Sequence, residues 1–161
     1  MNFEPLKVRL SAEGLVVAFR LTLSNICNEI VTDVSVNVAM RSADGSAIQA
    51  PARTNLPSMF FDALRPGDAA VHEGEVGLGT QSFHPIPADG AQMLLPIVDL
   101  FPRYTDAQGG LHELHLPVLI GQEHRPQTAK IAPFRLGAAI APHRAIGCRI
   151  LQMPSGARPV N

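Results

Sequence analysis

The segment LFPRYTDAQGGLHELHLPVLIG, residues 100–121, has the densest histidine spacing in the chain, with His112 and His115 around Glu113. Imidazole nitrogens bind zinc and copper, and imidazole is a frequent general base, so this spacing raises metal or acid–base chemistry. Residues three apart share a face on a helix but point to opposite faces on a strand. The backbone around these histidines therefore decides which chemistry is open to them.

The flanking residues predict a strand. Gly109 and Gly110 precede the segment, and Pro117 and an apolar run rich in β-branched residues follow it, which disfavours a helix. One face of this strand would carry Leu111, Glu113, His115 and Pro117, and the other would carry His112, Leu114, Leu116 and Val118. We therefore expect His112 and His115 not to share a metal.

The remaining histidines and three methionines are scattered along the chain. They are His72, His84, His124 and His143, with Met59, Met93 and Met153 as thioethers that could join imidazoles around copper. No His-x-His or Met-x-x-Met spacing is present. We favour solvated surface histidines. The alternative is a copper or zinc site, which would require two or more of His72, His84, His112, His115 and His143 to converge.

Signatures of nucleophilic and phosphate chemistry are missing from the sequence. There is no G-x-S-x-G elbow, and Cys148 lies in a strand-like run that suits a packed thiol. Gly74, Gly77 and Gly79 are close together but have no lysine or helix after them. We predict no enzyme activity, no catalytic residues and no cofactor, and a hydrolase would require a serine or cysteine beside a histidine in a pocket.

Composition excludes several classes of partner. The 161 residues carry a net charge of −1, so no overall field attracts nucleic acid or anionic lipid. Aromatic residues make up 5%, with no tryptophan and only Tyr104 as tyrosine, which leaves few stacking platforms for sugars or bases. A hydrophobic fraction of 46% indicates a globular chain with a substantial core.

The two cysteines and the amino-terminal residues bear on location. Cys27 and Cys148 could pair only if the first and last strands were neighbours, and two free thiols are the favoured interpretation. The residues after Met1 lack the basic segment, apolar run and cleavage site of a signal peptide, and no apolar window of about 18 residues exists. As given, the chain is expected to be neither inserted nor exported.

Alternation with period two predicts strands in the first forty residues, over 5–10, 17–25 and 32–41. Val34, Val36, Val38 and Met40 form the buried face of the third of these strands, and the polar segment NICNEIVTD before it is the connection through which one strand crosses to the next. Residues 46–58 read as a loop, followed by one helical turn around 58–64.

The second half predicts further strands separated by turns. We expect an edge strand over 71–78, a crossover or second edge over 83–88, and two apolar arms joined by the turn Asp106–Gly110. A last strand over AIGCRILQM would complete the sheets. Seven to nine short strands indicate an all-β, antiparallel, immunoglobulin-like β-sandwich spanning residues 1–152, with a polar tail over 153–161. A core tryptophan and the antibody cysteine spacing are missing, so the likeness is one of architecture.

Four blocks of sequence carry a resemblance to a family. MLLPIVDLFPRYTDAQGGLHELHLPVLIGQE is followed by KIAPFRLG, and FRLTLSN and VTDVSVNVAM come earlier. Together these blocks resemble the carboxy-terminal domain of uncharacterised alphaproteobacterial single-pass envelope proteins, over most of residues 3–150. In those proteins a proline-rich segment and a membrane helix with a basic flank precede an immunoglobulin-like domain. The resemblance implies a domain on the cytoplasmic face of the inner membrane, and it implies no functional residues.

The sequence thus leads to a non-catalytic interaction or scaffolding domain, membrane-associated in its full-length form. Proline-interrupted segments at 83–88 and 94–102 are the predicted edges where a partner protein could add a strand, and self-association is also open. The alternative function is a metal-binding β-sandwich that uses histidine and methionine ligands.

Overall fold

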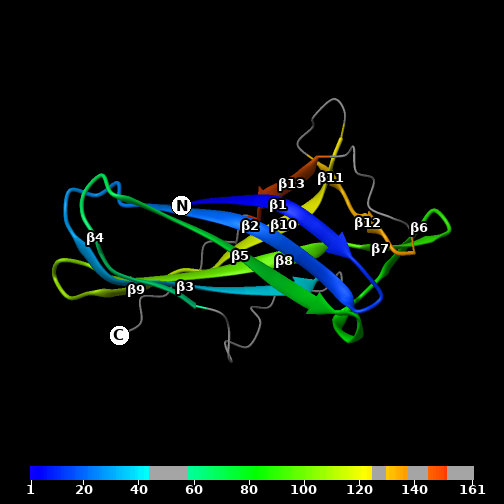
Figure 1. Ribbon diagram of the computed structural model, residues 1–161, viewed down its shortest axis with the longest axis horizontal. Coiled ribbons are helices and arrows are strands. Elements are labelled where there is room, and N and C mark those ends of the chain that lie inside the picture. Colours follow the sequence, from blue (N-terminus) through cyan, green and yellow to red (C-terminus); the bar gives the residue numbers. More distant parts are fainter. Residues whose placement is uncertain (44–57, 125–129, 138–144, 152–161) are drawn as a thin grey trace.

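The computed structural model describes residues 1–43, 58–124, 130–137 and 145–151, and these residues form antiparallel sheets with no α-helix among them (Figure 1). The strands are β1 (Asn2–Leu10), β2 (Gly14–Ser24), β3 (Val31–Ser42), β4 (Ser58–Leu64), β5 (Ala69–Gly79), β6 (Ile86–Ala88), β7 (Ala91–Leu94), β8 (Pro96–Thr105), β9 (Leu111–Glu113), β10 (Leu116–Glu123), β11 (Ile131–Ala132), β12 (Phe134–Arg135) and β13 (Ile146–Ile150). One turn of 3-10 helix, η1 (Thr80–Ser82), follows β5.

The first sheet has the order β1-β2-β5 and shows the alternation that the sequence predicted. On β2, the buried side chains are Leu15, Val17, Phe19, Leu21 and Leu23. The outer face carries exposed ion pairs instead, in which Arg20 contacts Glu4 and Glu73, and Arg9 contacts Glu75. This sheet therefore has one core face and one solvated, charge-paired face.

The second sheet has the order β11-β10-β8-β3-β4, with β13 also paired to β10 and β9 paired to β8. Val34, Val36, Val38 and Met40 of β3 are buried, as predicted. The predicted connection between the second and third strands is present. Since β2 and β3 belong to different sheets, it crosses the sandwich, which the sequence did not predict.

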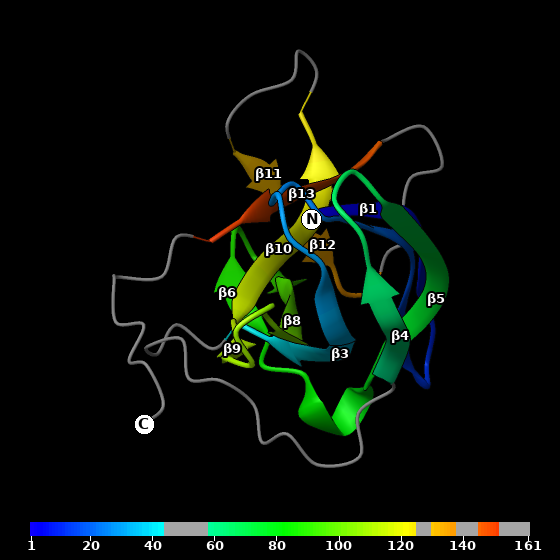
Figure 2. The same cartoon turned by 90° about the vertical axis from the view of Figure 1, so that its left-hand side faces the viewer.

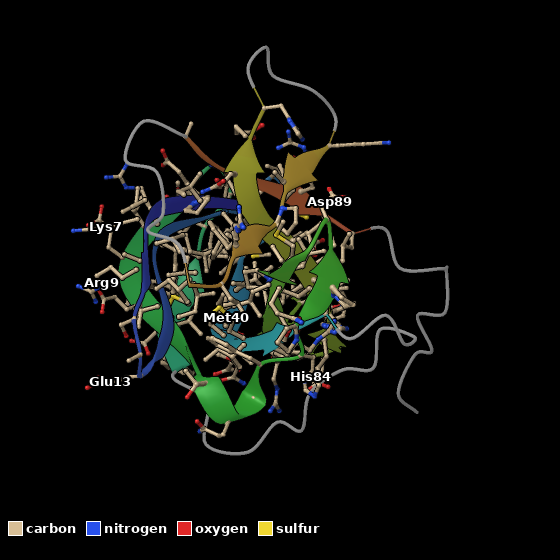
Figure 3. The ribbon with its side chains drawn as sticks, turned by 90° about the vertical axis from the view of Figure 1, so that its right-hand side faces the viewer. Lys7, Arg9, Glu13, Met40, His84 and Asp89 are labelled. Atoms are coloured by element: carbon tan, nitrogen blue, oxygen red, sulfur yellow. The ribbon has the colours of Figure 1, made fainter. Side chains whose placement is uncertain are left out.

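The two sheets pack face to face around one hydrophobic core and come together along both sides, where β13 lies beside β1 and β4 lies beside β5 (Figure 2). A small third sheet, β12-β7-β6, lies at one end of the sandwich. Its Leu94 and Phe134 belong to the core and have no exposed surface. Figure 3 looks onto this closed end, with Met40 inside and Lys7 and Arg9 pointing outward from the first sheet.

The small sheet begins with a tight hairpin at the residues Ala-Asp-Gly, which we did not predict. Asp89 and Gly90 form the two-residue connection between β6 and β7, and both have positive φ, 49° and 71°. Asp-Gly is a favoured pair for this type of turn because the glycine and aspartate tolerate positive φ. The segment 83–88 therefore contains an edge strand, β6, as expected.

Two sequence predictions are wrong. Residues 58–64 form strand β4 and not a helical turn, because their backbone pairs in antiparallel register with β3. The segment 94–102 is not an edge: most of it lies in β8, between β3 and β10 in the middle of the second sheet. The prolines of this segment had predicted an edge, but Pro102 lies in the interior of the sheet.

The all-β antiparallel class predicted from the sequence is confirmed. The edge position of β5 is confirmed as well, because β5 pairs only with β2 in its sheet. The predicted last strand corresponds to β13. The predicted loop over 46–58 falls mostly outside the described residues, and the predicted tail 153–161 lies wholly outside them.

Candidate functional site

His112 lies in β9, and His115 lies in the short interruption between β9 and β10. The register does not slip there, because Arg103 pairs with Glu113 and Leu100 pairs with Leu116. The amide of Leu114 donates to the carbonyl of Pro102 at 2.9 Å, but Pro102 has no N–H to donate in return. Pro102 is tolerated in this interior strand because the N–H that it lacks would point toward the interruption between β9 and β10.

The predicted separation of the two imidazoles is confirmed. His112 stacks on Tyr104 with ring centroids 4.8 Å apart, and its register partner on β8 is the same Tyr104. His115 stacks on Phe101, also at 4.8 Å. Tyr104 packs against the core, whereas Phe101 is buried on the opposite face of β8. The two histidines therefore lie on opposite faces of the sheet and share no ligand.

His115 belongs to a buried charge network on the outer face of the second sheet. Asp99 has no exposed surface, and its carboxylate uses both oxygens. Oδ1 lies 2.6 Å from Nε2 of His115, and Oδ2 accepts a hydrogen bond of 2.7 Å from Nε of Arg41. The network joins β8 and β3 to the residue just before β10. Nη2 of Arg41 is buried as well and has no hydrogen-bond partner among the described residues.

This network resembles part of a catalytic arrangement but lacks the rest of it. A carboxylate that holds an imidazole is the orienting half of an acid–base pair. No serine or cysteine is paired with His115 or His112 in the hydrogen bonds of the described residues. The neighbouring Arg41 instead compensates the charge of Asp99, as a buried carboxylate requires. The geometry supports a structural tie across three strands.

His112 belongs to a second network, which organises the turn of the β8–β9 hairpin. Oδ1 of Asp106 accepts hydrogen bonds from the amides of Gln108 and Gly110, and Oδ2 lies 2.7 Å from Nε2 of His112. The hydrogen bond to His112, followed by that from Gly110, lowers the pKa of Asp106 below its ordinary value of 3.8. The hairpin predicted from Asp106–Gly110 is confirmed, and its first residue fixes its shape.

The structure places the other candidate ligands apart. His72 on β5, His84 after η1 and His124 after β10 are exposed, while Met59 is buried in the core and Met93 lies in β7. His143 and Met153 lie outside the described residues. Within the described parts of the chain, no three histidine, cysteine, aspartate or glutamate side chains come together to hold a metal. The convergence required by the metal-binding alternative is therefore not found among them.

Both thiols are free, as the sequence favoured. Cys148 is half-buried on β13 and donates a weak hydrogen bond to the carbonyl of Phe3 at 3.5 Å, so the first and last strands are indeed neighbours. Burial raises the pKa of the Cys148 thiol above its ordinary value. Cys27 is exposed in the connection between β2 and β3, away from that contact.

The feature that sequence reasoning missed is an apolar cavity between the two sheets, at the end opposite the small third sheet. We call this end the open end; it faces the viewer in Figure 2. The cavity has a volume of about 240 Å³. Its lining consists of Met1, Leu23, Ser24, Asn25, Ile26, Cys27, Val31, Val34, Leu64, Pro102, Arg103, Tyr104, Leu114 and Leu116.

Large apolar side chains at the mouth of this cavity are exposed to solvent. Ile26 is 92% exposed, Leu114 is 45% exposed and Met1 is 43% exposed. Ile30, at the end of the same connection as Ile26, is 47% exposed. We call Met1, Ile26 and Leu114 the apolar rim. Single exposed apolar residues need no explanation, but a group of them around an apolar cavity is a candidate binding surface.

The connection that carries Ile26 is held in place by polar contacts, so the rim is preorganised. The side-chain amide of Asn25 donates to the carbonyls of Glu29 and Leu64, at 2.8 and 2.9 Å, and its oxygen accepts from the amide of Cys27. Nε2 of Gln108, in the β8–β9 turn, donates to Oε2 of Glu29 at 2.9 Å. These contacts link the two sides of the mouth.

Comparisons with known proteins add no identity, since no family model, curated protein or solved structure matches this chain. Across the described residues there is also no helix with the length and apolarity that crossing a bilayer demands.

Proposed function

We propose that the protein is a non-catalytic interaction domain that binds a partner protein through the open end of its sandwich. The observation that carries this proposal is the apolar cavity with its apolar rim, Met1, Ile26 and Leu114. Apolar pockets surrounded by exposed apolar residues are where partner proteins insert their anchoring side chains.

The strand arrangement supports a binding role of this kind. The first, second and fifth strands form one sheet, and β3, β8 and β10 form the centre of the other, which is the arrangement of strands A, B, E and C, F, G in immunoglobulin domains. We propose an immunoglobulin-like domain on this basis. In such domains the connections at one end of the sandwich commonly carry recognition.

The edge strand suggested by the sequence is the weaker candidate. β6 has three residues, with Pro87 in the middle and Pro85 just before it. Proline has no N–H to donate, so β6 offers a partner strand few backbone hydrogen bonds. The open end is therefore the better surface.

The test is site-specific photo-crosslinking in cells, with a photoreactive amino acid placed at Ile26 in one protein and at Val71 in another. Val71 is 59% exposed on β5, at the outer face of the first sheet, and serves as the matched control. We expect a crosslinked partner at Ile26 and none at Val71. Any partner must then bind the purified full chain, and Ile26→Asp must weaken that binding while Val71→Asp does not.

Equal crosslinking at both positions, or binding unaffected by Ile26→Asp, would contradict the proposal. Both variants alter exposed side chains, so their melting temperatures should remain close to that of the unmodified protein, and this measurement excludes misfolding as the cause of lost binding.

A further inference from the structure

The volume of the open-end cavity limits what can fill it. At about 240 Å³, the cavity is smaller than the roughly 300–1,000 Å³ typical of sites for drug-sized ligands. It is larger than an apolar cavity of about 150 Å³, which is enough to bind benzene. A single large apolar side chain, such as that of leucine, methionine or phenylalanine, therefore matches it better than a cofactor does.

The rim indicates that this side chain belongs to a macromolecule. A small molecule enclosed in the cavity would leave most of Ile26 in water, because Ile26 lines the cavity but is 92% exposed. A polypeptide that inserts one anchor would also cover Ile26 and Leu114 with the residues on either side of the anchor. This is the usual anatomy of a binding hot spot, a filled pocket whose surroundings exclude water.

Charge in the chain connections next to the cavity indicates what lies beside the anchor. Glu29 lies in the β2–β3 connection that carries Ile26, and Asp106 lies in the β8–β9 turn; neither lines the cavity, and both are hydrogen-bonded by Gln108. We call Glu29 and Asp106 the acidic lip. The pKa of Asp106 is lowered by His112 and by backbone amides, so its carboxylate stays ionised at neutral pH. The guanidinium that lines the cavity, Arg103, lies 3.8 Å from the carboxylate of Glu113, which offsets its charge.

We propose that the occupant of the cavity is one large apolar side chain of a partner protein, carried next to a positively charged residue that contacts the acidic lip; this inference rests on the proposed function. The anchor supplies affinity through burial of apolar surface. The charge pairs at the exposed lip add little affinity but select the partner and speed its association.

The test uses the full chain and three acetylated, amidated pentapeptides in titrations followed by the methyl NMR signals of Leu114 and Val34. The first probe is Gly-Lys-Phe-Lys-Gly, the second replaces its phenylalanine with alanine, and the third replaces both lysines with glutamate. Toluene is the probe for a free small molecule. Protection of the Cys27 thiol from alkylation gives a second readout, because Cys27 lines the cavity.

We expect the phenylalanine peptide to bind about tenfold or more tightly than its alanine counterpart, from burial of one aromatic side chain. We expect it to bind about two- to fivefold more tightly than the glutamate peptide, with the difference shrinking in high salt. Glu29→Gln should reduce that preference and leave the preference for phenylalanine over alanine unchanged. Asp62→Gln, an exposed acidic position on β4, is the control and should change neither.

Three results would overturn the inference: equal binding of the phenylalanine and alanine peptides, a preference for glutamate, or toluene binding more tightly than every peptide. The last would identify a small-molecule site. The crosslinking at Ile26 is read separately. If a partner is captured there while the peptides do not discriminate, the interaction domain stands and this assignment of its ligand falls; if no partner is captured, the proposed function itself fails.

Discussion

Replacing Asp99 with asparagine tests whether the buried charge network holds the second sheet together. The carboxylate has no exposed surface and satisfies Arg41 and His115 at 2.7 and 2.6 Å. Asparagine keeps the shape but carries no charge and offers one carbonyl oxygen in place of two carboxylate oxygens. The guanidinium of Arg41, whose side chain is 19% exposed, then loses its counter-charge.

The expected cost follows from that burial. Removing one partner of a buried ion pair costs about 3–5 kcal/mol, out of a total stability of about 5–15 kcal/mol for a typical domain. For a chain of this length, about 1 kcal/mol lowers the melting temperature by about 2–4 °C, so Asp99→Asn should lower it by about 6–20 °C. Urea denaturation followed by circular dichroism measures the free energy, and calorimetry measures the melting temperature.

Two controls make this prediction sharp. Glu75→Gln removes the exposed ion pair with Arg9 and should cost about 0.2–1 kcal/mol, because water screens it. Replacing Asp99, Arg41 and His115 together with leucine, methionine and leucine should recover most of the loss, since no charge is left buried. A loss below about 1 kcal/mol for Asp99→Asn would refute the reasoning that this carboxylate is an essential counter-charge.

Three further predictions concern the core, the hairpin turn and the thiols. Phe134→Ala, at a fully buried position, should cost about 3–5 kcal/mol, whereas Phe60→Ala, at a position 62% exposed, should cost far less in the same urea titration. Because folding lowers the pKa of Asp106, the stability that its carboxylate contributes is present above pH 3.8 and is lost as the pH falls below that value. Calorimetry from about pH 5 to pH 2.5 should therefore show a smaller acid-induced decrease in melting temperature for Asp106→Asn than for the unmodified protein. Iodoacetamide at pH 8 should modify exposed Cys27 about tenfold or more faster than Cys148, whose pKa is raised by burial, and equal rates in peptide mass spectrometry would contradict this.

The sequence was sufficient for the features that depend on neighbouring residues. Alternation at Val34, Val36 and Val38 identified a strand and its buried face, because side chains on a strand alternate between faces whatever the strand packs against. The spacing of His112 and His115 excluded a shared metal by the same geometry.

Features that depend on distant pairing could not be found this way. Asp99 in the apolar run PIVDLF signals a buried carboxylate that needs a partner, but Arg41 is 58 residues away and meets it only through the pairing of β3 with β8. Pro102 misled us for a related reason: whether a proline marks an edge depends on which way its missing N–H points, and the sequence does not contain that direction.

The difference between the two ends of the sandwich explains why the proposed binding surface could not be predicted from the sequence either. At the closed end, Phe134 comes from a two-residue strand far along the chain and fills the space between the sheets. At the open end no described side chain fills the corresponding space, and Ile26 stands at its mouth almost fully exposed. An apolar side chain that the fold leaves in water contributes little to stability, so selection for folding alone gives no reason to keep an isoleucine there. Ile26→Asp should therefore separate the two roles, since it leaves the melting temperature nearly unchanged and removes the contact on which binding depends.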